Sequence, residues 1–153
     1  MYRKKYYKCD CKCEPEDLLG GAQEGIERIK DGRKDILCGL HLICCCCKIC
    51  EGIRLIERGI RKIEKGLDDL IDGLKCLEFE CDYKNDSNFK RGICGVRDAL
   101  QCLKKGLCQL QKCCLCDGVE SIQCGLQHLD EALCYLEKAM EDAVGGRRHV
   151  CCC

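Results

Sequence analysis

The sequence predicts an all-α protein, an antiparallel four-helix bundle built from two duplicated αα-hairpins. Three observations indicate this fold: apolar residues recur every seven positions, small residues recur in step with them, and short polar or cysteine-rich segments interrupt the repeat. Apolar residues spaced three and four apart form one face of an α-helix. No segment shows the apolar-polar alternation that is typical of a half-buried strand.

The seven-residue repeat has the form Gly-apolar-x-x-apolar-x-x and is clearest in residues 51–77, EGIRLIERGIRKIEKGLDDLIDGLKCL. If the residue after each glycine is called a, positions a and d of this segment are always Ile or Leu. The same frame fits residues 25–43, 92–114 and 118–145, with Arg33 as the misfit at an a position. We expect four amphipathic helices, each about 40–45 Å long.

Position g, directly before each a, is almost always Gly or Ala. A glycine inside a helix costs roughly 1 kcal/mol relative to alanine, so its regular recurrence needs a structural reason. Small residues beside the a/d positions let two helix backbones approach closely, which favours tight antiparallel pairing. We therefore predict a dry Ile/Leu core at a and d with small residues beside it. The g residues are Gly25, Gly32, Gly39, Gly52, Gly59, Gly66, Gly73, Gly92, Ala99, Gly106, Gly118, Gly125, Ala132 and Ala139.

The predicted bundle lies between two cysteine-rich termini. An N-terminal arm (1–14) precedes the bundle (15–146), and a cysteine-tipped tail (147–153) follows it. Within the bundle we expect one hairpin over 15–80, a polar loop at 81–88 and a second hairpin over 89–146.

Local signals predict the helix ends. Pro15, followed by two acidic residues, favours a helix start. Asp117 with Glu120 resembles a capping box, and Gly145-Gly146 is typical of a helix end.

Two internal similarities indicate a duplication. GRKDIL (32–37) resembles GVRDAL (95–100), and CCKICEGI (46–53) resembles CCLCDGV (113–119). Each half therefore contains a helix, a cysteine-rich turn and a second helix. In an up-down-up-down bundle both turns lie at one end, and the termini lie at the other.

Composition argues against several classes of partner. The net charge is zero and 34% of residues are charged with interleaved signs, so we expect no nucleic-acid or membrane partner. Only 5% of residues are aromatic, which leaves little to stack on bases or sugars. No apolar stretch approaches the roughly 20 residues of a transmembrane helix.

The outstanding feature is the 22 cysteines. Such a content is typical of disulfide scaffolds or thiolate metal proteins. One end of the bundle is predicted to carry Cys44, Cys45, Cys46, Cys47, Cys50, Cys113, Cys114 and Cys116. The opposite end is predicted to carry Cys9, Cys11, Cys13, Cys81, Cys151, Cys152 and Cys153. The heptad frame places none of the remaining cysteines at a or d, so we expect them to point outward. These are Cys38, Cys76, Cys94, Cys102, Cys108, Cys124 and Cys134.

Outward thiols on the flanks and at both ends favour a structural protein that assembles with copies of itself into disulfide-cross-linked filaments or lattices. Terminal arms without core contacts can reach a neighbouring chain. Adjacent cysteines suit bonds to several partners better than bonds to each other. The predicted intermolecular disulfide residues are Cys9, Cys11, Cys13, Cys44, Cys45, Cys46, Cys81, Cys151, Cys152 and Cys153.

The alternative is a thiolate metal-binding or storage protein. Two C-x-x-C pairs, Cys47 with Cys50 and Cys113 with Cys116, are expected at the same end and can hold one tetrahedral Zn²⁺. The CDCKC arm offers alternating thiolates suited to soft ions such as Cu(I). Copper storage proteins resemble this chain in bundle and composition, but such a store needs thiolates inside the bundle, where this sequence has Ile and Leu. The disulfide hypothesis requires no cofactor.

The N-terminal MYRKKYYKCDCKC and the cysteine-tipped tail resemble cysteine-rich structural proteins of the bacterial endospore envelope: coat, exosporium and spore-surface appendages. That resemblance implies a resistant, self-assembling material, with itself and other cysteine-rich envelope proteins as partners. It also implies a location outside the cell or on the spore surface without a secretory signal peptide, because such proteins are exposed when the mother cell lyses. The alternative location is the cytoplasm, where thiols stay reduced.

Nothing in the sequence favours an enzyme. A redox-active C-x-x-C normally accompanies a βαβ pattern, and haem attachment needs C-x-x-C-H; neither is present. His41, His128 and His149 share no helix face with both a cysteine and a carboxylate, so we expect them to be solvent-exposed without a catalytic role.

Overall fold

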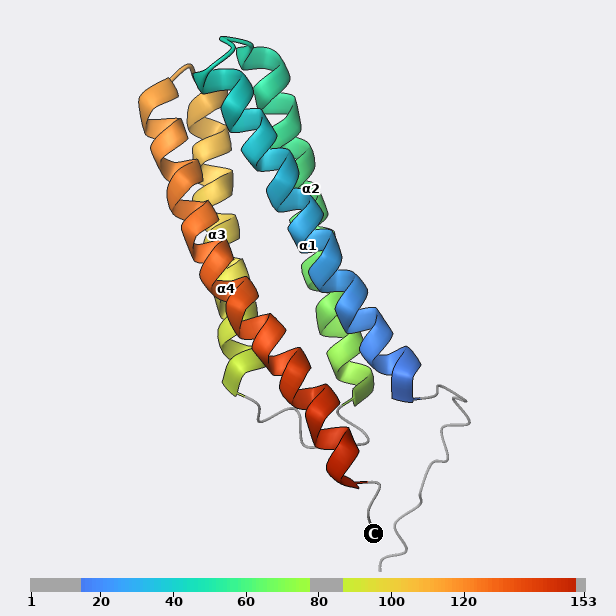
Figure 1. Ribbon diagram of the computed structural model, residues 1–153. Coiled ribbons are helices and arrows are strands. Elements are labelled where there is room, and N and C mark those ends of the chain that lie inside the picture. Colours follow the sequence, from blue (N-terminus) through green and yellow to red (C-terminus); the bar gives the residue numbers. More distant parts are fainter. Residues whose placement is uncertain (1–14, 78–86, 151–153) are drawn as a thin grey trace, which may run out of the picture.

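The computed structural model describes the backbone of residues 15–77 and 87–150 and the side chains of residues 19–75 and 88–143. This part of the chain forms four helices and no strand: α1 (Pro15–Cys44), α2 (Ile49–Leu77), α3 (Ser87–Gln111) and α4 (Leu115–Val150). Helices α1 and α2 pack as a first hairpin and α3 and α4 as a second, with both connecting turns at one end of the molecule (Figure 1). The predicted four-helix bundle is confirmed.

Several predicted features lie outside this description. They are the arm at 1–14 with Cys9, Cys11 and Cys13, loop residues 81–86 with Cys81, tail residues Cys151, Cys152 and Cys153, and the side chains of Cys76 and His149.

The helix ends agree only in part with the local signals. Helix α1 begins at Pro15, as predicted. Helix α4 begins at Leu115, so Asp117 lies within its first turn, where a negative charge is still favourable, and does not cap it. The prediction that Gly145-Gly146 ends the last helix is wrong, because α4 continues to Val150. No described glycine has a positive φ, so neither adopts the left-handed conformation with which glycine ends a helix.

The glycines of the first hairpin bring two helix backbones into direct contact. A Cβ atom added to Gly32 would lie 2.5 Å from the carbonyl oxygen of Gly59, and one added to Gly59 would lie 2.5 Å from that of Gly32. Any side chain at these positions would force the helices apart, which explains why position g is glycine. The facing pairs are Gly25 with Gly66, Gly32 with Gly59, and Gly39 with Gly52.

The second hairpin repeats this contact with slightly larger residues. A Cβ atom on Gly106 would lie 2.9 Å from the carbonyl oxygen of Gly118, and one on Gly125 would lie 3.1 Å from that of Ala99. In two of the three facing pairs, alanine takes the place of glycine on one helix. The facing pairs are Gly92 with Ala132, Ala99 with Gly125, and Gly106 with Gly118.

This register corrects one of the two internal similarities. Gly32 faces Gly59 in the first hairpin, and Ala99 faces Gly125 in the second. The counterpart of Gly32 is therefore Ala99, whereas the similarity of GRKDIL to GVRDAL would pair it with Gly95. The duplication holds at the level of the packed hairpin, and the short similarity in the first helix of each half is out of register.

The most deeply buried large side chains of each hairpin lie at position d, beside the small residues at g. The large residues that are less than 2% exposed are at d, with Ile26 at a as the exception. They are Ile26, Ile29, Ile36, Ile56, Ile63, Leu70, Leu103, Leu110, Ile122, Leu129 and Leu136. Burying each such side chain stabilises the fold by about 1.5–3 kcal/mol. The a residues Ile60, Leu67 and Leu100 are also buried, as predicted, but several other a residues are only partly buried. These are Ile53, Leu74, Ile93, Leu107 and Val119.

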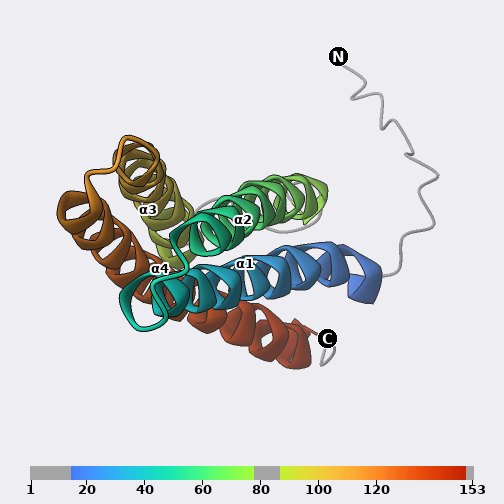
Figure 2. The same cartoon turned by 90° about the horizontal axis from the view of Figure 1, so that it is seen from above.

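Positions a and e face the other hairpin. Because the glycines turn position g toward the partner helix, the opposite flank of each helix, a and then e, turns toward the second layer. Ion pairs between hairpins lie there: Lys30 with Glu137 and Arg33 with Asp130 join α1 to α4, and Lys104 with Glu64 (3.0 Å) joins α3 to α2. Seen from above, the two hairpins form two layers that cross at an angle (Figure 2). Arg33, which does not fit the apolar a pattern, therefore pairs with Asp130 of the other hairpin.

Candidate functional site

The described cysteines lie at the surface. Of the fourteen whose side chains are described, all are free, thirteen are exposed, and Cys102 is half-buried. None belongs to the hydrophobic core of the described residues. The prediction that the helix cysteines lie at exposed positions is therefore confirmed for all of these except Cys102.

The two cysteine-rich turns share a local conformation. Cys47 and Cys113 have φ values of 55° and 64°, the left-handed region that favours glycine. In the second turn, the Cys113 N–H donates to the Leu110 carbonyl (3.1 Å) and the Cys114 N–H to the Gln109 carbonyl (2.9 Å). These two bonds form a Schellman motif, with a cysteine where glycine is usual.

The first turn is one residue longer. There the Lys48 N–H donates to the Leu42 carbonyl (2.9 Å), six residues back rather than five. The similarity of residues 46–53 to residues 113–119 thus corresponds to equivalent turns, each with its C-x-x-C at the same end of the bundle (Figure 1).

The thiols predicted to bind metal at the turns do not form a cluster. Cys47, Cys50, Cys113 and Cys116 are all exposed. Among the described residues, they belong to no group of three or more Cys, His, Asp or Glu whose ligand atoms lie within 4.8 Å of one another. A zinc site at the turns stays a prediction.

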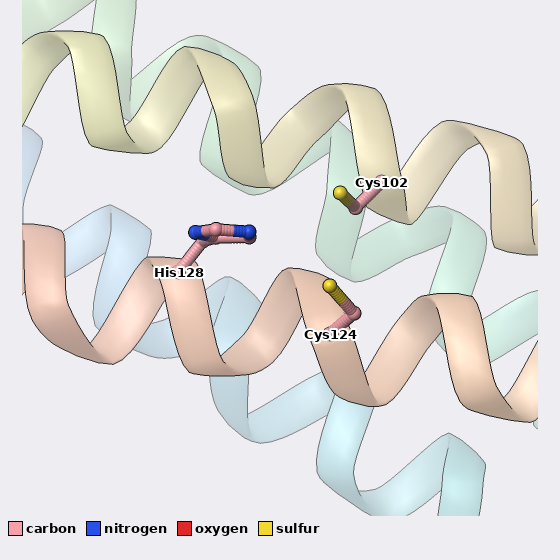
Figure 3. Close-up of side chains that lie close together, drawn as sticks. All are labelled: Cys102, Cys124 and His128. Atoms are coloured by element: carbon pink, nitrogen blue, oxygen red, sulfur yellow. The ribbon is translucent and has the colours of Figure 1, made fainter.

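One such group exists elsewhere, between the helices of the second hairpin. Cys102 of α3 and Cys124 and His128 of α4 bring their ligand atoms within 4.8 Å of one another. All three side chains project into the space between α3 and α4 (Figure 3). Cys102 and His128 occupy position c of the heptad, and Cys124 occupies position f. These positions lie next to g, on the side of the helix that faces away from the other hairpin. The cluster therefore lies on the outer face of the second hairpin.

Sequence reasoning assigned these three residues to outward positions and missed their proximity. Cys124 and His128 are four residues apart, and this spacing places both on one face of a helix. Their position opposite Cys102 depends on the register between α3 and α4, which the pairs Ala99–Gly125 and Gly106–Gly118 set.

The surroundings of Cys102 favour the neutral form of its thiol over the thiolate. Burial raises the pKa of Cys102, and the neighbouring Cys124 raises it further. A polar groove is lined by both thiols and also by Lys105, Gln109, Asp117, Glu120 and Ser121. In this groove the Ser121 hydroxyl donates a hydrogen bond to Oε1 of Gln109 (2.7 Å). The groove leaves the thiols accessible from solvent.

The equivalent positions of the first hairpin hold an ion-pair network. Asp35 of α1 accepts two hydrogen bonds from the Arg58 guanidinium (3.0 and 3.1 Å) and contacts the Lys62 ammonium at 2.8 Å. Burial acts to raise the pKa of Asp35, but the bonds from Arg58 and Lys62 outweigh it and hold this pKa below its usual value.

Chemically, two thiols and one imidazole form a set of soft ligands. Thiolates and imidazole bind Cu(I) and Zn²⁺ in preference to Mg²⁺ or Ca²⁺, which require oxygen ligands. The two thiols can alternatively be oxidised to a disulfide, in which case two protons and two electrons pass to an oxidant.

None of the described helices is long and apolar enough to span a membrane. Comparisons with known proteins found no family model that matches the chain, no similar curated protein and no similar solved structure.

Proposed function

We propose that this is a structural, self-assembling protein whose chains are joined by disulfides between exposed cysteines. One observation supports this most: thirteen of the fourteen cysteines with described side chains are exposed and free, while Ile and Leu fill the core. The fold therefore does not need the cysteines for packing. They are available for bonds between chains.

The distribution of the thiols suits links in several directions. Eight of the described cysteines lie in or beside the two turns, and the others lie on the helix flanks. Each intermolecular disulfide forms when two thiols lose two protons and two electrons to an oxidant such as oxygen or a small disulfide. Dissociation of the chains would then require reduction.

The predicted connectors at the opposite end are the cysteines of the arm and tail. A contact between two unlike ends is heterologous and propagates into an open filament unless the rotation closes a ring. Lateral bonds through flank thiols would extend the filament into a lattice. We further propose that the assembly is a protective or surface-appendage material, such as the spore envelope, and that it has no catalytic activity.

Electrophoresis of the full chain tests this proposal. After air oxidation at micromolar concentration, we expect a ladder of covalent oligomers without reductant and a single monomer band with it. A chain that stays monomeric in both lanes after oxidation would contradict the proposal.

Two serine variants then locate the connectors. The first replaces the turn cysteines, and the second replaces the flank cysteines Cys38, Cys94, Cys108 and Cys134, all exposed. We expect the turn variant to shorten the ladder strongly and the flank variant to leave long linear oligomers. A ladder that is unchanged in the turn variant would assign the links to other thiols.

A further inference from the structure

We propose that Cys102, Cys124 and His128 form a binding site for one soft metal ion, best matched by Cu(I). This inference is independent of the proposed structural function, because it concerns thiols that face one another within a single chain.

The donor atoms are already close to coordinating distances. Metal–sulfur and metal–nitrogen bonds of about 2.0–2.3 Å place the ligands of one ion roughly 3.5–4 Å from one another. The Cys102 and Cys124 sulfurs and a His128 ring nitrogen lie within 4.8 Å of one another. This spacing exceeds the separation in a coordinated set by roughly 1 Å at most.

The scaffold that carries the three ligands is rigid. All three stand on helices, and α3 contacts α4 close to the site through Gly125 against the backbone of Ala99 and through Gly106 against that of Gly118. Ligands on packed helices are held more accurately than ligands on loops.

The equivalent three positions of the first hairpin also carry side chains that contact one another. Cys102 is three residues after Ala99, as Asp35 is three after Gly32. Cys124 and His128 flank Gly125 as Arg58 and Lys62 flank Gly59. In the first hairpin, one residue on the first helix contacts both partners on the second at 2.8–3.1 Å. The same three positions of the second hairpin also converge, with ligand atoms within 4.8 Å of one another, and they carry soft ligands in place of opposite charges.

The ligand set selects the ion. Two sulfurs and one nitrogen satisfy the coordination of Cu(I), for which three soft ligands suffice. Zn²⁺ normally takes four ligands, so it would need a water molecule at this site. No Asp or Glu belongs to the group, which disfavours hard cations.

Reciprocal exchange of the two networks provides the test. In the reduced full chain under anaerobic conditions, Cu(I) is titrated against a chromophoric Cu(I) chelator, and the ions held per chain are counted. The exchange Cys102→Asp, Cys124→Arg and His128→Lys transfers the ion pairs of the first hairpin and should remove one ion. The exchange Asp35→Cys, Arg58→Cys and Lys62→His transfers the ligands in the other direction and should add one. Circular dichroism verifies that both variants keep the helical fold.

Matched controls separate this site from the other thiols. The pair Cys94→Ser and Cys134→Ser removes one exposed cysteine from each of α3 and α4 and should leave the tightest ion in place. His128→Gln should lower the affinity for that ion at least about tenfold. His41→Gln on α1 should leave the affinity unchanged. An unchanged ion count in both exchanges, or equal effects of His128→Gln and His41→Gln, would overturn the proposal. Binding of Zn²⁺ but not Cu(I) at the three residues would overturn the assignment to Cu(I).

Discussion

At the scale of single residues, the glycines at position g of α1 and α2 determine how closely the two helices pack. Their Cβ positions would overlap backbone atoms of the partner helix at 2.5–2.7 Å. Backbone atoms cannot turn away as a flexible side chain can. Glycine therefore costs helix propensity at each g position but permits the contact on which the whole hairpin depends.

Replacing Gly32 with alanine should destabilise the bundle by about 1–3 kcal/mol, because the added methyl group overpacks the helix interface. That loss exceeds the gain of about 1 kcal/mol in helix propensity. The matched control is Gly20→Ala on the same helix, where an added Cβ meets nothing within 4 Å, and this change should stabilise by up to about 1 kcal/mol. Chemical denaturation of both variants measures the difference. A Gly32→Ala protein as stable as Gly20→Ala would show that the helices do not pack this closely.

At the scale of secondary-structure elements, each turn has a cysteine in a conformation that suits glycine better. A side chain in the left-handed region costs about 1–2 kcal/mol in backbone sterics. Cys113 follows the C-terminus of α3, and the Schellman hydrogen bonds hold its backbone in this conformation. The thiol of Cys113 is exposed and free, so it is accessible to partners outside the fold.

Cys113→Gly should raise the free energy of unfolding by up to about 1 kcal/mol, because glycine relieves the steric cost but gains entropy in the unfolded chain. Cys114→Gly, one residue further on and without a positive φ, should give no such gain. Thermal unfolding under reducing conditions compares the two. A loss of stability in Cys113→Gly would indicate that its side chain stabilises the turn.

Asp35 links the two helices of the first hairpin through Arg58 and Lys62 and gives that hairpin a pH dependence. Because the folded-state pKa of Asp35 is lowered from 3.8, its contribution is present above that value and is lost as the pH falls below it. Asp35→Asn should therefore cost about 1 kcal/mol at neutral pH and progressively less in acid. Asp31→Asn, at an exposed position on the same helix, serves as the control. Urea titrations over a range of pH measure both; a penalty that persists unchanged at pH 2 would contradict this prediction.

At the scale of the whole molecule, the two hairpins join through an interface layer that is less tightly packed than the interior of either hairpin. Partly buried a residues and ion pairs at a and e form this layer. Ion pairs at these exposed positions contribute little to stability. Their placement favours the observed pairing of α1 with α4 and α2 with α3 over alternatives with like charges in contact.

Arg33→Asp should test this layer, because it places a negative charge opposite Asp130. We expect a loss of about 0.5–1 kcal/mol at low salt and a smaller loss in 1 M salt, where exposed charges are screened. Adding Asp130→Arg should restore most of it. Equal losses in the single and double variants would show that the two side chains do not interact.

Much of this architecture follows from the sequence alone. The seven-residue repeat determined four helices, the burial of d residues and the outward position of the cysteines, because helix periodicity is a local property of the chain. The glycines at g likewise predicted close helix contacts. The start of α1 at Pro15 was visible for the same local reason.

Other features were decided by contacts between helices. The glycine contacts turn position g toward the partner helix. Because of this rotation, d faces the partner helix of the same hairpin, whereas a faces the other hairpin. Heptad labels alone do not specify that rotation.

The cluster of Cys102, Cys124 and His128 shows this division most clearly. The sequence determined that each lies on an outward flank of its helix, and the four-residue spacing placed Cys124 and His128 together. Their convergence on Cys102 depends on the register of α3 against α4, which backbone contacts at Ala99 and Gly125 impose. Helix periodicity determines the direction of a side chain around its own axis, whereas its distance to a side chain on another helix is set only when the two backbones pack.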